Sequence, residues 1–121
     1  MSETVVRVVV VDDSPVFLQA ASAVVTATPG FELVGTADSG EQAVTVSKAL
    51  LPDLVLMDVR MPGLGGLKAA RRIHEEAPSA VVTMLTADSA GPPGTEDIPI
   101  LSKRRLTPRT LIEHWARVAP A

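Results

Sequence analysis

Three aspartates, a threonine and a lysine stand out because each follows a run of apolar residues. Asp12 and Asp13 follow a valine-rich run, Asp58 ends DLVLMD, Thr86 ends AVVTMLT and Lys103 follows ILS. Carboxylates favour hard cations, while hydroxyl and ammonium groups donate to phosphate oxygens. If the fold brings these residues together, their types predict phosphoryl transfer to a carboxylate.

Three neighbouring carboxylates repel one another unless a cation or shared protons offset their charge. The chain has no cysteine and no well-placed histidine, so only oxygen ligands remain, and these favour Mg²⁺ or Mn²⁺. Lys103 and Thr86 would then serve a phosphoryl group at the same ion. A lone aspartate near a strand end is more often a cap or turn residue, and Asp38 and Asp53 are interpreted that way.

The elements that must position these groups alternate between strand and helix. Apolar runs predict five strands, at 5–11, 31–37, 53–58, 80–86 and 98–102. Capping residues and helical periodicity predict helices after Ser14, after Ser39, from Leu67 to Glu76 and after Thr107. This order predicts an α/β fold, a parallel sheet with helices on both faces. The carboxyl ends of its strands are where ligands bind.

One segment interrupts the alternation. Residues Asp88–Asp97, DSAGPPGTED, hold two prolines and two glycines where a fourth crossover helix would be expected. Proline removes a backbone donor and glycine weakens a helix by about 1 kcal/mol relative to alanine. The sequence therefore predicts a loop there, with at most one helical turn.

Composition excludes several classes of protein. The 121 residues, 46% apolar and with a net charge of −3, suit one domain over residues 1–121 and no basic nucleic-acid platform. Val and Ala supply 17 and 16 residues against three aromatics, as suits buried parallel strands. Lack of cysteine excludes thiol chemistry, and no run is long enough for a membrane span or shaped like a signal peptide. A cytoplasmic domain is expected.

The stretches VVVVDDSPVFL, PDLVLMDVRMPGLGGL, VVTMLTA and ILSKRRLTPRTL resemble, in this order, the motif blocks of response-regulator receiver domains. The resemblance covers nearly the whole chain, and DLVLMDVRMPG is its most specific block. It implies a flavodoxin-like, doubly wound (βα)₅ fold and a sensor histidine kinase or phosphotransfer protein as partner. It also implies a phosphoacceptor, Asp58, with self-phosphorylation and autodephosphorylation, and not a turnover enzyme.

The same resemblance implies a metal site. Asp13 and Asp58 would bind Mg²⁺ through their carboxylates, Arg60 through its backbone carbonyl and Asp12 through a water molecule. The loop after Asp58, MPGLGG, is rich in glycine, which would let it turn away without crowding the acceptor.

The resemblance implies that Thr86 is the switch hydroxyl and that Lys103 holds a phosphoryl oxygen. Two positions depart from the family pattern: Ile100 replaces an aromatic residue, and Arg104 replaces the proline of a cis peptide bond. With the shortened fourth crossover, these changes predict an intact pocket whose output runs through Asp88–Asp97 or through another face.

Two other functions follow from the same residues. The domain could be a phosphorylation-independent interaction module, a pseudo-receiver. An aspartyl hydrolase is disfavoured, because its second aspartate would stand where Arg60 does. A homodimer and an output domain beyond residue 121 are both compatible with the sequence. His74 and His114 are predicted to be exposed on helices, with Trp115 as a packing anchor.

Overall fold

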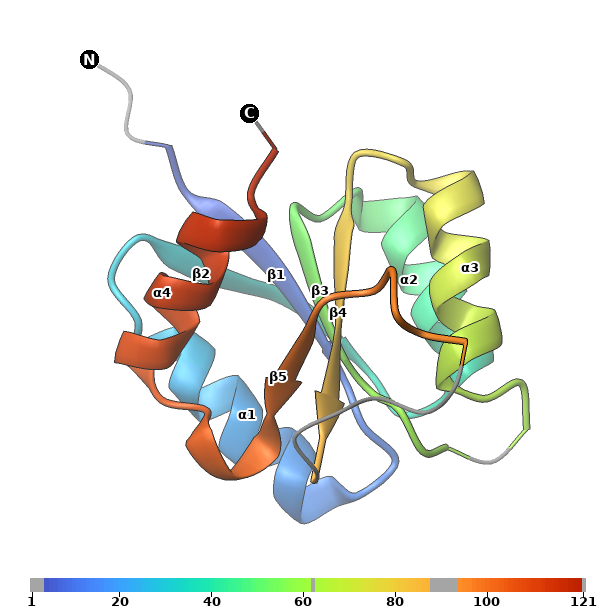
Figure 1. Cartoon of the computed structure of the whole chain (residues 1–121), viewed down its shortest axis with the longest axis horizontal. Coiled ribbons are helices and arrows are strands. Elements are labelled where there is room, and N and C mark those ends of the chain that lie inside the picture. The colour runs from blue at the N-terminus through green and yellow to red at the C-terminus, as the bar shows by residue number, and fades with distance from the viewer. Residues whose placement is uncertain (1–3, 62, 88–93, 121) are drawn as a thin grey trace.

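The fold is built on a five-stranded parallel sheet with the order β2-β1-β3-β4-β5 (Figure 1). The structure, a computed structural model, describes residues 4–61, 63–87 and 94–120. The strands are β1 (Val6–Val11), β2 (Phe31–Ala37), β3 (Leu54–Asp58), β4 (Val81–Thr86) and β5 (Ile100–Ser102). The helices are α1 (Pro15–Ala27), α2 (Gly40–Leu50), α3 (Gly66–Glu76) and α4 (Pro108–Val118), with a 3₁₀ turn η1 (Lys103–Arg105). The predicted fold class is confirmed.

Side-chain caps begin α1, α2 and α4 where the sequence predicts. The Ser14 hydroxyl accepts a hydrogen bond from the Phe17 N–H, and that of Ser39 accepts one from Gln42 at 3.1 Å. Thr107 and Thr110 cap each other reciprocally at the start of α4. These side chains satisfy N–H groups that a helix start leaves without partners. Among the described residues, no helix has the length and apolar character needed to cross a membrane.

The core consists of two layers, one on each face of the sheet. Helices α1 and α4 cover one face, and α2 and α3 cover the other (Figure 1). Along β1 the valines alternate between the layers: Val8 and Val10 pack with α1, and Val9 and Val11 pack towards α2 and α3. All four are fully buried. Successive side chains of a strand point to opposite faces of the sheet, and helices cover both faces here. A continuous apolar run is therefore needed at these positions.

The connection from β4 to β5 contains turns and no helix over its described residues, 94–99. The remainder of the predicted loop, residues 88–93, lies outside the described residues. Arg71 on α3 holds this connection, because its guanidinium donates to both carboxylate oxygens of Asp97, at 2.6 and 3.0 Å, and to Gly94 O. A bidentate pair of this kind fixes geometry as well as charge.

Two expectations about apolar positions need correction. Helical periodicity places Val16 with Leu18 on the apolar face of α1, but Val16 is 80% exposed, and Phe17 packs against the core beside Leu18. The last strand is shorter than expected, because Pro99 has no N–H to donate and the Ile98 N–H turns back to Thr95 O. The strand therefore begins at Ile100.

The prediction of an exposed His114 is wrong. Its side chain is buried, at 2% exposure, and its Nε2 lies 2.8 Å from the hydroxyl oxygen of Thr83 on β4. Position 114 is three residues after the buried Leu111, so it shares the inward face of α4. Trp115 packs partly buried against the same core layer, as expected.

Burial lowers the pKa of His114, and the positive charge of Arg117 adds to this effect. The unfolded chain therefore takes up the proton at a higher pH than the folded protein. We expect the free energy of unfolding to fall as the pH drops below about 6.5, the ordinary pKa of histidine. Between about pH 7 and 5.5, the free energy of unfolding of His114→Gln, measured with urea, should depend less on pH than that of the wild type.

The exposed His74 on α3 supplies the control for this experiment. Unfolding of His74→Gln should follow the wild-type dependence on pH. If His114→Gln also followed it, the buried imidazole would not be the titrating group.

Candidate functional site

The end of β1 delivers two aspartates of different character. Asp12 is fully buried, and its Oδ1 accepts a hydrogen bond from the Ser14 N–H at 2.8 Å, which turns the chain into α1. Its Oδ2 lies 3.0 Å from the ammonium nitrogen of Lys103, an ionic contact without a well-directed hydrogen bond. Asp13 is exposed to solvent. One carboxylate is therefore fixed by the fold and the next is accessible from outside.

Asp58 is the last residue of β3, the strand next to β1. Its residue exposure is 6%, and its Oδ1 accepts a hydrogen bond from the Arg60 N–H at 3.3 Å. The first residue of α3, Gly66, returns so close that a Cβ there would lie 2.7 Å from Asp58 O. Glycine at this position therefore allows the loop to fold back against β3, a more specific role than the predicted one of turning away.

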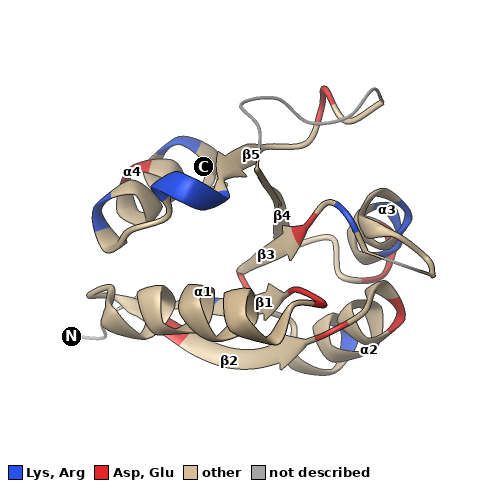
Figure 2. Ribbon diagram, turned by 90° about the horizontal axis from the view of Figure 1, so that it is seen from below, with Lys and Arg blue, Asp and Glu red and all other residues tan. Residues whose placement is uncertain are grey.

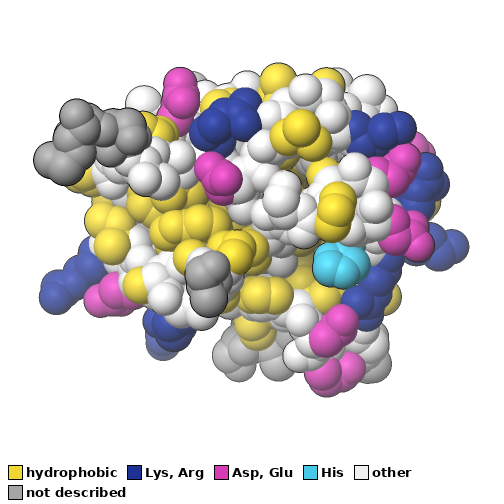
Figure 3. Space-filling model, turned by 90° about the horizontal axis from the view of Figure 1, so that it is seen from above, with side chains coloured by type: hydrophobic (Ala, Val, Ile, Leu, Met, Phe, Trp, Pro, Cys, Tyr) yellow, Lys and Arg dark blue, Asp and Glu magenta, His cyan; other side chains and the backbone are white. Residues whose placement is uncertain are grey.

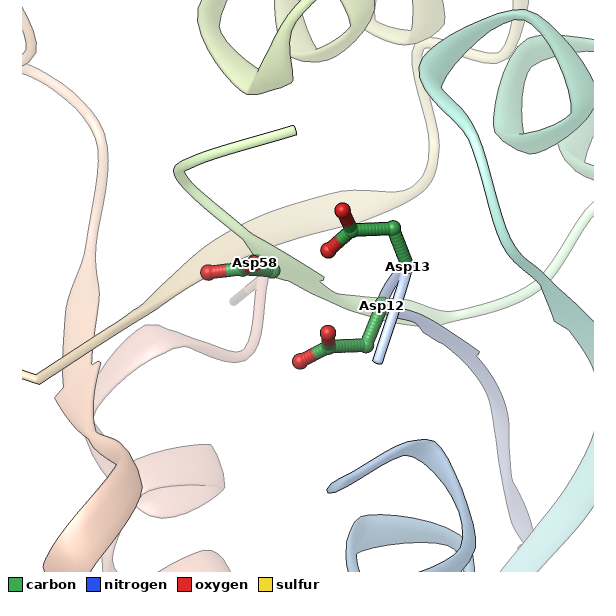
Figure 4. Close-up of side chains that lie close together, drawn as sticks. All are labelled: Asp12, Asp13 and Asp58. Atoms are coloured by element: carbon green, nitrogen blue, oxygen red, sulfur yellow. The ribbon is translucent and has the colours of Figure 1, made fainter. Parts of the chain in front are cut away.

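The three carboxylates converge, as Figure 4 shows. One oxygen from each of Asp12, Asp13 and Asp58 lies within 4.8 Å of the others. The pairing of β1 with β3 places Val11 opposite Met57, and the next residue after each of them is an aspartate. This brings the carboxylates of Asp12 and Asp58 together, and Asp13 follows directly. In Figure 2 acidic residues follow the ends of β1 and β3 on the same edge of the sheet.

Lys103 reaches this cluster from η1, directly after the edge strand β5. Its ammonium nitrogen lies 3.2 Å from Asp58 Oδ1 as well as 3.0 Å from Asp12 Oδ2. The lysine side chain is 20% exposed. The predicted meeting of the acidic residues with a lysine from a distant segment is therefore present in the structure.

The charges in this cluster are out of balance. Burial raises the pKa of Asp58, and the Asp12 carboxylate raises it further, against the opposing effects of the Arg60 N–H and Lys103. Burial lowers the pKa of Lys103, but its two carboxylate partners outweigh that effect and raise the pKa overall. Lys103 therefore stays protonated at neutral pH, while its single charge faces several carboxylates.

Thr86 and Arg60 lie at the same edge of the sheet. Thr86 is the buried last residue of β4, one position beyond Leu85, which is level with Asp58. Arg60 is exposed in the loop that follows Asp58. The structure thus brings all six predicted site positions to the same edge of the sheet, at the carboxyl ends of its strands. Sequence reasoning missed Phe17, whose ring lies beneath the Lys103 ammonium; its place in the first turn after the acidic pair was the available signal.

Comparison with known proteins places this arrangement in a family. Residues 8–96 match the model of the response regulator receiver domain. The chain belongs to that family. Receiver domains are signalling modules whose general role is to be phosphorylated by histidine kinases, and they generally bind Mg²⁺ at an acidic pocket.

Curated relatives of this receiver domain include larger regulators. The response regulator GacA of Pseudomonas viridiflava is 39% identical over 72% of this chain and 41% of its own length. A protein-glutamate methylesterase/protein-glutamine glutaminase 2 of Anaeromyxobacter dehalogenans is 41% identical over 69% of this chain and 24% of its own length. The chain thus spans less than half the length of these relatives.

Solved structures of receiver domains share the fold. The response regulator domain of Thermotoga maritima CheB superposes with a TM-score of 0.82 and 26% identity, covering 96% of this chain and 99% of that one. The receiver domain of NarL from Mycobacterium tuberculosis gives a TM-score of 0.76 with 28% identity, over 90% and 94% of the two chains. The flavodoxin-like receiver fold is therefore confirmed.

The unusual positions of this receiver domain lie beyond the matched range. Ile100 is partly buried and packs against the core layer that α2 and α3 cover. The Lys103–Arg104 peptide bond is trans, as expected without proline. Both positions follow residue 96, where the family match ends. The acidic residues and Thr86 fall within the match, and Lys103 falls outside it.

Gly66→Ala tests the close approach of α3 to the end of β3. Its Cβ would lie 2.7 Å from Asp58 O and 2.8 Å from Val59 O, both backbone atoms that cannot swing aside. We expect a loss of about 1–3 kcal/mol in the free energy of unfolding, measured with urea. Helix propensity alone predicts the opposite sign, because alanine is favoured over glycine by about 1 kcal/mol.

Gly40, the first residue of α2, is the matched control. A Cβ there would lie 3.1 Å from its nearest neighbour, Gly65 O, a milder approach. Gly40→Ala should therefore cost less than Gly66→Ala, and the reverse order would contradict this account of the loop.

Proposed function

We propose that residues 1–121 act as one phosphoacceptor domain in which Asp58 takes a phosphoryl group from a phosphohistidine of a sensor kinase or phosphotransfer protein. The observation that carries this is the convergence of three carboxylates within 4.8 Å with the ammonium of Lys103 between two of them. A carboxylate is a usable nucleophile when neighbouring positive charge stabilises the transferring group. The partner, the output and a cytoplasmic location are parts of this proposal.

In the transfer, an Asp58 carboxylate oxygen attacks phosphorus as the bond to the donor's imidazole nitrogen breaks. The electron pair of the broken bond stays on that nitrogen, and the product is an aspartyl phosphate. Lys103, whose ammonium nitrogen lies 3.2 Å from Asp58 Oδ1, would hold a phosphoryl oxygen. Thr86, at the end of the neighbouring strand, would supply the switch hydroxyl. Hydrolysis of the aspartyl phosphate restores the carboxylate, so the domain itself resets.

The residues present fit Mg²⁺, with Mn²⁺ as a substitute. All donors are oxygens, Asp12 Oδ2 has no directed hydrogen bond, and the carboxylates outnumber the lysine that offsets them. Asp13 and Asp58 would hold the ion directly, Arg60 through its backbone carbonyl and Asp12 through water. When bound, the ion would neutralise charge on the transferring oxygens.

Asp58→Asn tests the acceptor. We expect the wild-type chain, incubated with radiolabelled acetyl phosphate and Mg²⁺, to take up label, and Asp58→Asn to fall to background. The reason is that an amide oxygen cannot form the aspartyl phosphate. Asp38→Asn, at an exposed aspartate outside the cluster, is the control and should label as the wild type does. Equal labelling of all three chains would refute the acceptor assignment; none in any chain would favour the pseudo-receiver.

Asp13→Asn tests the ion. A ligand that binds only the folded state stabilises it by about 2.7 kcal/mol at a hundredfold excess over Kd. We therefore expect millimolar Mg²⁺ to raise the melting temperature of the wild type and to have a much smaller effect on Asp13→Asn. Glu75→Gln removes an exposed carboxylate from α3 as the control. If Mg²⁺ raised the melting temperature of Asp13→Asn as much as that of Glu75→Gln, the ion would act elsewhere.

A further inference from the structure

The Lys103 ammonium has an aromatic neighbour besides its two carboxylate partners. Its nitrogen lies 4.3 Å from the centre of the Phe17 ring, over the ring face. A cation within about 6 Å of a ring centre is attracted by the negative face of the ring. The carboxylates of Asp12 and Asp58 lie at 3.0 and 3.2 Å from the same nitrogen. The ammonium is thus held by two negative charges and by the face of one aromatic ring.

Phe17 itself is firmly placed. It sits in the first turn of α1, and its N–H donates to the capping hydroxyl of Ser14. Its side chain packs against the core layer that contains Ala21, Leu85 and Leu111, from α1, β4 and α4. The ring is therefore fixed by the core on one side and offers a face to the lysine. The lysine, by contrast, reaches the cluster on a flexible four-carbon chain from η1.

Phosphorylation requires the ammonium to change partners. Before transfer its N–H groups face Asp12 and Asp58, and afterwards at least one must face a phosphoryl oxygen on Asp58. A carboxylate contact must weaken for this to happen, and during the exchange a lysine held only by carboxylates could swing into solvent. A ring face accepts no particular N–H group, so it can hold the cation while the N–H groups turn.

We propose that Phe17 is a positioning residue, whose ring is a non-directional seat that keeps the Lys103 ammonium at the acceptor while its N–H groups exchange partners. This inference rests on the proposed phosphoacceptor function of Asp58. Phe17 acts through Lys103 and touches no reacting atom.

The rival explanation is that Phe17 only fills the core, and the test must separate the two. Fluorinated phenylalanines at position 17, with one, two and three ring fluorines, keep the size and hydrophobic character of the ring while progressively weakening its negative face. Phe17→Tyr keeps the face, and Phe17→Leu removes it. Val24→Ala, in the same helix and core layer, is the control for lost packing away from the lysine.

Two readouts are needed. In the metal-free full chain, the ε-methylene protons of Lys103 should be shifted upfield by the ring current of Phe17, and Phe17→Leu should abolish this shift. With Mg²⁺ and acetyl phosphate, the initial rate of labelling should fall about twofold to fivefold in Phe17→Leu, the range expected for a partly exposed cation–π contact. The logarithm of that rate should decline steadily along the fluorine series. Phe17→Tyr and Val24→Ala should stay within about twofold of the wild type.

A rate that is flat along the fluorine series, or equal in Phe17→Leu and Phe17→Tyr, would overturn the seat while leaving Asp58 as the acceptor. An absent upfield shift would overturn it as well. If the wild-type chain took up no label, the proposed function would fail, and the seat would fail with it.

Discussion

The structure depends on holding the carboxylates of Asp12 and Asp58 side by side and almost out of water. Such a pair is unfavourable, because each charge loses its solvation and repels the other. The ammonium of Lys103 bridges both and offsets part of the cost. What remains uncompensated is an excess of negative charge that a divalent cation would relieve. The same charge imbalance would be the source of the affinity for Mg²⁺ that is proposed above.

The fold supplies this arrangement with few degrees of freedom. Parallel pairing makes the ends of β1 and β3 level, so two aspartates that are 46 positions apart meet without any loop having to direct them. The buried valines of β1 fix the strand from both faces, and Gly66 lets α3 close behind Asp58. The lysine is different, because it follows a strand of three residues at the edge of the sheet. Its position must be secured by its contacts.

The sequence allowed most of the elements and the acidic cluster to be predicted, because both follow from local patterns. A continuous apolar run indicates a strand that is buried on both faces, and a polar residue after the run indicates where that strand ends. His114 was missed because an imidazole at an inward position is stable only with a partner. That partner, Thr83, lies 31 residues away on β4. Nothing local distinguishes such a histidine from an exposed one. Val16 was placed on the buried face for a similar reason, since the direction in which α1 leaves β1 decides which side of its first turn faces the core.

The contacts of Lys103 are present although two residues close to it in sequence depart from the receiver-domain pattern. The match to the receiver-domain family model ends at residue 96, before β5 and η1. Beyond that point the aromatic and proline positions carry Ile100 and Arg104, yet Lys103 still contacts Asp12 and Asp58. Pairing of β5 with β4 is what brings this lysine to the acidic residues. The pairing of Met84, Leu85 and Thr86 with β5 sets the point from which the lysine reaches the acidic residues. The hydrogen-bonded path from Asp58 to Lys103 therefore runs through β4 and β5.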